Sequence, residues 1–133
     1  MNGVQILESF FRAFGSGDQE LLLSLFDPAV KVRAVRSGTA GPSLYGEYTG
    51  LSGLQAMLGK LSVLFSTEAF QVDRVLGDGT RGVAEGHFVH RVRATGKAFE
   101  SAWVLSCSIE GNKIVEYRFY EDSAAYEKAA MAG

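Results

Sequence analysis

One histidine interrupts the apolar face of a strand that we predict over residues 81–93. Alternate residues of a strand point to opposite faces, so His90 shares its face with apolar neighbours and His87 points the other way. These neighbours are Ala84, Gly86, Phe88 and Val92. Because imidazole changes its charge near neutral pH, a histidine inside an apolar concavity suits a proton-transfer site or a ligand pocket. The alternative is a buried, neutral imidazole that only bonds to a backbone carbonyl or to a tyrosine.

An acidic residue ends the last predicted strand, residues 113–121. We expect Glu121 to lie near the rim of a cavity, where partial burial raises the pKa of a carboxyl group. An ordinary exposed glutamate is the alternative. His90 and Glu121 are therefore the predicted catalytic residues. Asp122 precedes a short helical segment and is predicted to be its N-cap.

Aromatic and apolar side chains are the candidates for a ligand-binding wall. Trp103 lies on the buried face of a predicted strand, where it would help to form an aromatic lining for a planar or polycyclic ligand. Plain core packing is the alternative for these side chains. Tyr45 and Tyr48 belong to a glycine-rich loop, residues 37–50, and either gate the mouth of the pocket or anchor a surface loop. Arg33 either pairs with Glu121, holds a substrate carboxylate, or points outward. The predicted ligand-binding residues are Phe10, Arg33, Tyr45, Tyr48, Phe88, Trp103, Leu105, Tyr117 and Phe119.

The elements that must position these residues follow from periodicity, caps and turns. Asp18 and Ser52 are the predicted N-caps of the second and third helices, and Pro28 prevents the second helix from continuing. The predicted helices cover residues 4–14, 19–26 and 53–65, with a last short one after 122, and the predicted strands cover 29–35, 70–76, 81–93, 98–110 and 113–121. This order predicts an α+β domain in which three to four helices gather on one face of a curved antiparallel sheet and leave a cone-shaped cavity.

Composition narrows the class of protein. The chain has 133 residues, of which 47% are hydrophobic, and a formal net charge of −2, so we expect one domain over residues 1–133 and no nucleic-acid partner. A cluster at Arg91, Arg93 and Lys97 is interpreted as a solvated strand face. Cys107 is the single cysteine, which predicts a buried free thiol, no internal disulfide and a reducing compartment. No signal peptide or membrane-spanning run is predicted, so we expect a cytoplasmic protein without a membrane partner. No residues have metal-ligand spacing, and no metal or other cofactor is expected.

Two segments, FFRAFGSGDQELLLSLFDP and TGKAFES…EGNKIVEYRFYED, resemble the nuclear transport factor 2-like superfamily. Within it the chain is most similar to the SnoaL-like branch, which includes polyketide cyclases and ketosteroid isomerases. The resemblance implies an α+β barrel, a hydrophobic pocket and a homodimer joined through the sheet. It does not imply one activity, because this scaffold hosts isomerases, cyclases, hydrolases and binding proteins.

The catalytic positions of the isomerases are apolar or basic here. By the resemblance they fall at Phe10, at Arg33 or Ala34, and at Leu105. None of these side chains can act as the required carboxylic base or donor, so steroid isomerase activity is not expected.

Two other activities of the superfamily can be compared in the same way. Limonene-type epoxide hydrolase positions fall near Phe88, His90 and Phe119, so the paired carboxylates of that chemistry are missing. SnoaL-type cyclases rely on an acidic residue near the end of the last strand, which is Glu121 or Asp122 here.

The sequence therefore predicts a SnoaL-like enzyme that uses cofactor-independent acid/base chemistry on a small hydrophobic carbonyl compound, by cyclisation or isomerisation. One alternative is a non-catalytic binding protein for an apolar metabolite in the same pocket. Another is a domain that acts by dimerising through the outer sheet face, where side chains are small and neutral. That face would carry Ala102, Val104, Ser106 and Ser108.

Overall fold

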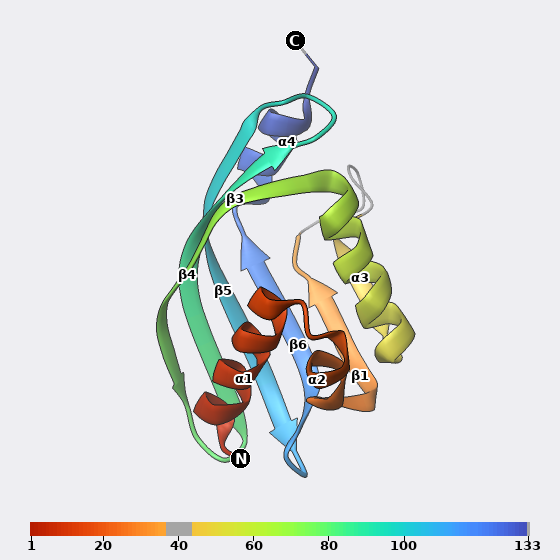
Figure 1. Ribbon diagram of the computed structural model, residues 1–133, viewed down its shortest axis with the longest axis vertical. Coiled ribbons are helices and arrows are strands. Elements are labelled where there is room, and N and C mark those ends of the chain that lie inside the picture. Colours follow the sequence, from red (N-terminus) through yellow and green to blue (C-terminus); the bar gives the residue numbers. More distant parts are fainter. Residues whose placement is uncertain (37–43, 133) are drawn as a thin grey trace.

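A curved six-stranded sheet forms the framework of the protein in the computed structural model, which describes residues 1–36 and 44–132 (Figure 1). The strands lie in the order β2-β1-β6-β5-β4-β3. They are β1 Phe26–Ala34, β2 Gly46–Thr49, β3 Phe65–Gly77, β4 Arg81–Val92, β5 Ala98–Glu110 and β6 Lys113–Glu121. The predicted α+β class is confirmed. The expected purely antiparallel sheet is wrong, because β1 pairs in parallel with β6, which is distant in the sequence.

Four helices accompany the sheet in the described residues, and three of them cover one of its faces (Figure 1). Helix α1 packs on β3 and β4, whereas α3 packs on β1, so a space remains between the two helices and the sheet. Helix α4 lies at one end of the sheet, beside the β4–β5 hairpin. None of the helices described is long and apolar enough to cross a membrane. Their bounds are α1 Gly3–Ser16, α2 Gln19–Ser24, α3 Gly50–Leu64 and α4 Ser123–Ala130.

Local sequence patterns predicted the strands of the C-terminal half of the chain accurately. The bounds of β4, β5 and β6 differ from the predicted strands by at most one residue, because both connecting turns have a clear sequence signature. Gly96 and Asn112 adopt φ angles of 73° and 61°, the left-handed conformation that these turns need. The predicted helix caps at Asp18 and Asp122 are also confirmed, since each carboxylate accepts a backbone N–H bond.

Three predicted boundaries in the N-terminal half are wrong. Helix α3 begins at Gly50 and not after Ser52, and its N-cap Thr49 makes no side-chain capping bond. Strand β1 begins at Phe26 and includes Pro28, which is tolerated because the pairing of β1 with β6 shifts between Phe26 and Lys31. Strand β3 begins at Phe65, five residues before its predicted start.

The predicted loop at residues 37–50 is replaced in part by β2 and the start of α3. Strand β2 pairs with β1, a tertiary contact that the loop composition did not indicate. Residues 37–43 of this predicted loop lie outside the described residues.

Strand alternation assigned the faces of the meander correctly. Phe88 and His90 are buried in β4, whereas His87 is exposed on the outer face and its Nδ1 lies 2.9 Å from a carboxylate oxygen of Asp73. In β5 the inward side chains are fully buried, including the free Cys107. Burial raises the pKa of the Cys107 thiol, so it stays protonated and packs as a small apolar group.

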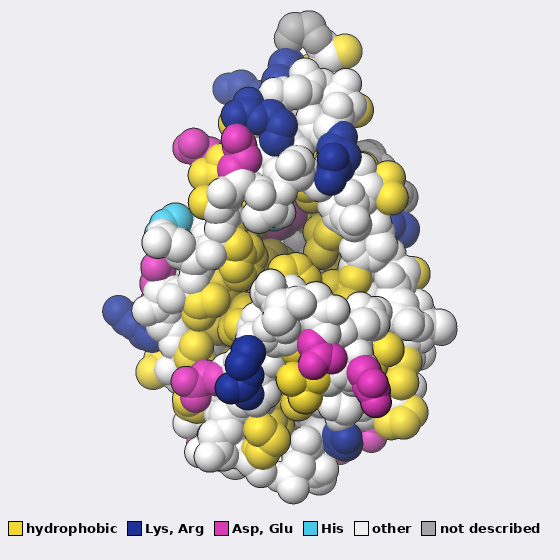
Figure 2. Space-filling model, viewed as in Figure 1, with side chains coloured by type: hydrophobic (Ala, Val, Ile, Leu, Met, Phe, Trp, Pro, Cys, Tyr) yellow, Lys and Arg dark blue, Asp and Glu magenta, His cyan; other side chains and the backbone are white. Residues whose placement is uncertain are grey.

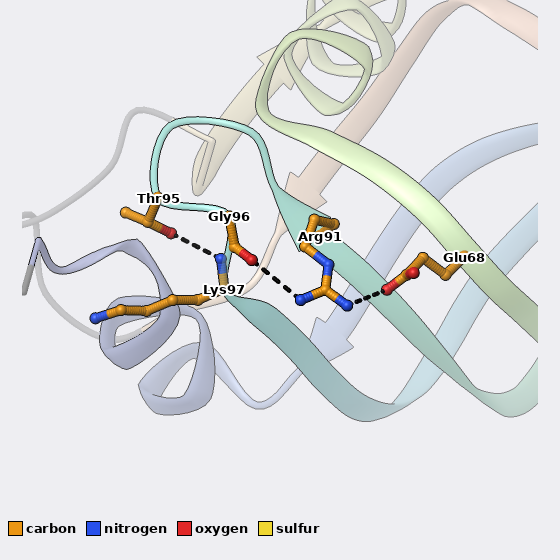
Figure 3. A network of polar contacts seen from close by, with 5 residues as sticks. All are labelled: Glu68, Arg91, Thr95, Gly96 and Lys97. Carbon is orange, nitrogen blue, oxygen red and sulfur yellow. Dashed lines mark hydrogen bonds and ion pairs between the residues drawn. The ribbon is translucent and has the colours of Figure 1, made fainter.

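The basic residues of the β4–β5 hairpin are engaged in structural contacts (Figure 3). The Arg91 guanidinium donates one bond to the Gly96 carbonyl at 3.0 Å and another to Glu68 on β3 at 2.9 Å. The Lys97 ammonium donates to a carbonyl just after α4, and Thr95 donates to another within it. These side chains therefore fasten the hairpin to β3 and α4.

Gly86 is the position of β4 at which a side chain is least tolerable. A Cβ atom there would lie 1.9 Å from the Gln71 carbonyl oxygen and 2.6 Å from the Trp103 indole. We predict that Gly86→Ala lowers the free energy of unfolding by at least about 2 kcal/mol, measured by chemical denaturation. The matched control is Gly59→Ala in the exposed middle of α3, where a Cβ meets nothing within 4 Å. That substitution should stabilise the protein by about 0.5–1 kcal/mol, and equal effects of the two variants would contradict the prediction.

Candidate active site

A cavity of about 320 Å³ lies between the inner face of the sheet and helices α1 and α3. Figure 2 shows it as a hollow whose walls are mostly hydrophobic side chains. Apart from the hydroxyl of Tyr117, the polar side chains that line it are those of Ser62, Thr67, His90 and Glu121. The other lining residues are Phe10, Phe11, Phe14, Ala34, Leu44, Met57, Leu58, Leu61, Phe65, Phe70, Tyr117 and Phe119.

Glu121 at the end of β6 is the acidic group of the cavity. Its Oε1 accepts a hydrogen bond of 2.7 Å from the Tyr45 hydroxyl. Burial raises the pKa of Glu121 to about 7, although the bond from Tyr45 opposes this rise. Burial and the neighbouring carboxylate raise the pKa of Tyr45 in turn, so its hydroxyl remains a donor. Glu121 can therefore both give and take a proton near neutral pH.

Tyr45 is held in place from outside the sheet. The Arg36 guanidinium lies 5.6 Å from the centre of the Tyr45 ring, and Arg36 forms an ion pair with Glu127 on α4. The ring of Tyr126, also on α4, is 5.8 Å from that of Tyr45. The position of Tyr45, the hydrogen-bond partner of Glu121, thus depends on contacts between α4 and residues that lie between β1 and β2.

His90 is held between two phenyl rings. Its imidazole is stacked on Phe88 at 4.0 Å and on Phe65 at 4.7 Å, with interplanar angles of 24° and 12°. The Nδ1 atom lies 2.9 Å from Oγ1 of Thr67, and no described residue bonds to Nε2. Burial lowers the pKa of His90 to about 4, so the ring is neutral at pH 7. When Thr67 donates to Nδ1, the ring proton is on Nε2, which can donate to a ligand.

The two predicted catalytic residues occupy separate places in the cavity. Strand register puts Glu121 opposite Trp103, and Trp103 opposite Gly86 on β4. His90 lies four residues further along β4. At roughly 3.3 Å per residue and 4.8 Å per strand, the Cα atoms of His90 and Glu121 are about 16 Å apart along the sheet. No hydrogen bond joins the two side chains, whose partners are Thr67 and Tyr45, so each can contact a different part of a ligand.

A model of the SnoaL-like domain family matches residues 7–117. The chain belongs to the SnoaL-like domain family. Comparison with curated proteins gives no match. The solved structure of an NTF2-like protein from Burkholderia xenovorans LB400 is 28% identical, with a TM-score of 0.84, and the match covers 97% of this chain and 95% of that one.

Two more solved structures share the fold of this SnoaL-like chain. A protein of unknown function with a cystatin-like fold from Xanthomonas campestris is 25% identical, with a TM-score of 0.76 and full coverage of both chains, 100% each. A candidate polyketide cyclase from Pseudomonas putida KT2440 is 15% identical, with a TM-score of 0.76, covering 98% of this chain and 99% of that one. The predicted family and fold are thereby confirmed.

The predicted site residues of the SnoaL-like chain are divided between the cavity and its surroundings. Phe10, Tyr117 and Phe119 line the cavity together with His90 and Glu121. The remaining predicted aromatic and apolar residues do not line the cavity and are packed in the core behind the lining residues. They are Phe88, Trp103 and Leu105, each almost completely buried.

The other predicted ligand-binding residues do not line the cavity. Tyr45 acts through its bond to Glu121. The Tyr48 hydroxyl donates to the Leu44 carbonyl and accepts a bond from Lys60 on α3, so it anchors this segment. Arg33 is exposed between the buried Val32 and Ala34, which matches the outward alternative and not the pair with Glu121.

Several cavity residues were not predicted. Phe11 and Phe14 lie beside Phe10 on α1, and their helical spacing was the available signal. No sequence pattern indicated that Thr67 belongs to a strand, because β3 follows α3 without any turn residue to mark its start. Within the described residues, no group of three His, Cys, Asp or Glu side chains is placed to hold a metal ion.

The pKa of Glu121 links the stability of this SnoaL-like protein to pH. A carboxyl group whose pKa is higher in the folded state stabilises the fold at low pH, and this contribution is lost as pH rises from about 4.5 to 7. We predict that Glu121→Gln gains stability relative to the unchanged protein between pH 5 and 8, by roughly 2–3 kcal/mol. Denaturant titrations at several pH values would measure this. Glu116→Gln, on the same strand, should show no comparable gain in stability over this pH range. A difference in unfolding free energy between Glu121→Gln and the unchanged protein that does not vary with pH would contradict the prediction.

The Tyr45 hydroxyl is predicted to set the pKa of Glu121. Because its hydrogen bond favours the ionised carboxylate, Tyr45→Phe should raise the pKa of Glu121 above about 7. The carboxyl carbon of Glu121 can be titrated by NMR in both proteins. A lower or unchanged pKa in the variant would show that the bond does not stabilise the carboxylate.

Proposed function

We propose that this protein is an enzyme that transfers protons on a small hydrophobic carbonyl compound without a cofactor, leading to isomerisation or cyclisation. The observation that carries the proposal is the Glu121 carboxyl group inside an apolar cavity, which accepts a hydrogen bond from Tyr45 on one oxygen and from no described residue on the other. A general base works best when its pKa is near the working pH, and burial brings Glu121 into that range.

In the proposed step, the ionised Glu121 takes a proton from a carbon that lies next to a carbonyl group, or next to a double bond conjugated with one. The electron pair of the broken C–H bond moves into the conjugated system, and the carbonyl oxygen gains negative charge. Protonated Glu121 then returns the proton to another carbon, which completes an isomerisation. In a cyclisation, the carbanion carbon instead attacks a second carbonyl carbon of the same molecule, and the proton goes to the new alkoxide oxygen.

His90 is proposed to stabilise the carbonyl oxygen rather than to take the proton. A ring with a pKa of about 4 is a weak base at neutral pH, but its Nε2–H remains a hydrogen-bond donor. Stacking between Phe65 and Phe88 fixes the ring, so the donor is oriented before the ligand binds. This changes the function expected of His90, from proton carrier to donor.

The solved structures offer limited support. Neighbours described as candidate polyketide cyclases or as a candidate isomerase are 15–16% identical to this chain, which shows the fold alone. The proposed chemistry therefore depends on the cavity of this chain.

A binding protein without catalytic activity is the second candidate function. It is favoured by the apolar Phe10 and Ala34 in the cavity wall, at positions where related isomerases are expected to carry polar catalytic groups. In that case Glu121 would serve only as a hydrogen-bond partner for the ligand.

The expected homodimer remains a proposal. The outer face of the sheet exposes apolar side chains, including Val104 on β5 and Tyr120 on β6, which are 37% and 39% exposed. Such side chains suit contact with a second copy of the chain.

Exchange of carbon-bound protons in deuterated water tests the catalytic proposal. We predict that the protein accelerates exchange next to the carbonyl group of cyclic ketones, followed by proton NMR across a panel of one to four rings. The rate should rise with pH through about 7, because Glu121 must be ionised to accept a proton. Glu121→Gln should lower the catalysed rate by roughly 10²–10⁴-fold.

Glu116→Gln is the matched control, since Glu116 lies on the same strand and its partner is Arg118 on the sheet surface. It should leave the rate unchanged. Ketones that bind in the cavity but exchange at the same rate with the protein and with Glu121→Gln would support the binding protein instead.

A further inference from the structure

The volume of the cavity limits the size of the ligand. An apolar cavity of about 150 Å³ holds one benzene ring. The cavity here measures about 320 Å³, roughly twice that value, so it suits two fused rings. Phenyl rings on several sides of the space, including Phe10 of α1, Phe70 of β3 and Phe119 of β6, offer faces and edges to a flat ring system.

The charge of the cavity limits the charge of the ligand. Among the described residues no lysine or arginine lines it, and Glu121 is the lining group that can carry a negative charge at neutral pH. A ligand carboxylate would lose its hydration without gaining a cation, and the ionised Glu121 would repel it. The site therefore favours an uncharged ligand.

Two polar groups of the cavity, on different strands, limit where the ligand carries its oxygens. Glu121 offers a hydrogen-bond acceptor at the end of β6, and His90 offers Nε2 at a separate place on β4. A ligand that reaches only one of them leaves the other group partly desolvated and unpaired, which costs binding free energy. A ligand with an oxygen at each end satisfies both.

We propose, on the basis of the proposed function, that the substrate is an uncharged conjugated compound of two fused rings, with a donor at one end for Glu121 and a carbonyl oxygen at the other for His90. Glu121 accepts a hydrogen bond from this donor and takes its proton from a neighbouring C–H bond, and conjugation across the rings would carry the electron pair of that bond to the carbonyl oxygen at the other end. His90 and Glu121 thus act on one electronic system although they lie on different strands.

Three ligands of similar size test this substrate class by isothermal titration calorimetry at pH 8. They are a naphthol with an acetyl group on the far ring, the same naphthol with an ethyl group, and the same naphthol with a carboxylate. We expect the acetyl compound to bind about tenfold more tightly than the other two, because only it gives His90 an uncharged acceptor. A carboxylate that binds as tightly as the acetyl compound, or equal affinities for acetyl and ethyl, would overturn the proposal.

A variant assigns the preference to His90. In His90→Phe, which keeps a flat ring between Phe65 and Phe88, the acetyl and ethyl compounds should bind equally. If this variant does not fold, Thr67→Val is the substitute, since loss of the hydroxyl releases Nδ1 and should reduce the same preference. A preference that persists unchanged in a folded variant would exclude His90 as the donor.

Ligand size is tested with a hydroxylated four-ring hydrocarbon, which should bind at least tenfold more weakly than the acetyl compound; tighter binding would overturn the size limit. These measurements concern affinity alone. The expected affinity pattern without any proton exchange would leave the substrate class standing and reject the enzymatic function. Proton exchange on ketones without that affinity pattern would support the enzymatic function and reject the substrate class.

Discussion

The buried indole of Trp103 is the contact on which the cavity depends. It lies against Gly86 of the neighbouring strand, where the absence of a side chain leaves room for the ring. Trp103 is stacked on Phe70 of β3 at 5.0 Å and on Phe119 of β6 at 5.6 Å. Phe70 and Phe119 line the cavity, although Trp103 does not. One side chain behind the wall therefore supports two rings of the wall, and each aromatic pair contributes about 0.5–1.5 kcal/mol beyond the area it buries.

Burial in this aromatic surrounding shifts the pKa values of the two titratable groups in opposite directions. It raises the pKa of Glu121 to about 7 and lowers that of His90 to about 4, because in both cases the charged form is the one that loses hydration. Between these two pH values both groups are mainly uncharged. The hydroxyl partners differ in effect: Tyr45 favours the ionised form of Glu121, whereas Thr67 fixes the orientation of His90. The fold thus supplies one carboxyl group that titrates near neutral pH and one neutral imidazole.

Sequence patterns predicted the parts of the fold that local rules determine. The meander from β4 to β6 was placed closely because turns at Gly96 and Asn112 mark its strands and alternation fixes their faces. Strand β2 and the start of β3 were missed because pairing with β1 and with β4, and not local composition, makes them extended. Alternation also separates the inner face from the outer one, but it cannot separate the cavity wall from the layer behind it. That distinction depends on the helices: Phe11 of α1 lies 5.5 Å from the Trp103 ring.

The two polar groups of the cavity are supported by different parts of the molecule. His90 is fixed by rings and a hydroxyl from the paired strands β3 and β4, so its orientation belongs to the sheet itself. Glu121 takes its partner from Tyr45, which is held by Arg36 and by the ion pair of Arg36 with Glu127 on α4. A sequence change in α4 can therefore alter the protonation of Glu121 while His90 keeps its position. The protonation of Glu121 thus depends on residues outside the sheet, whereas the orientation of His90 depends on the sheet alone.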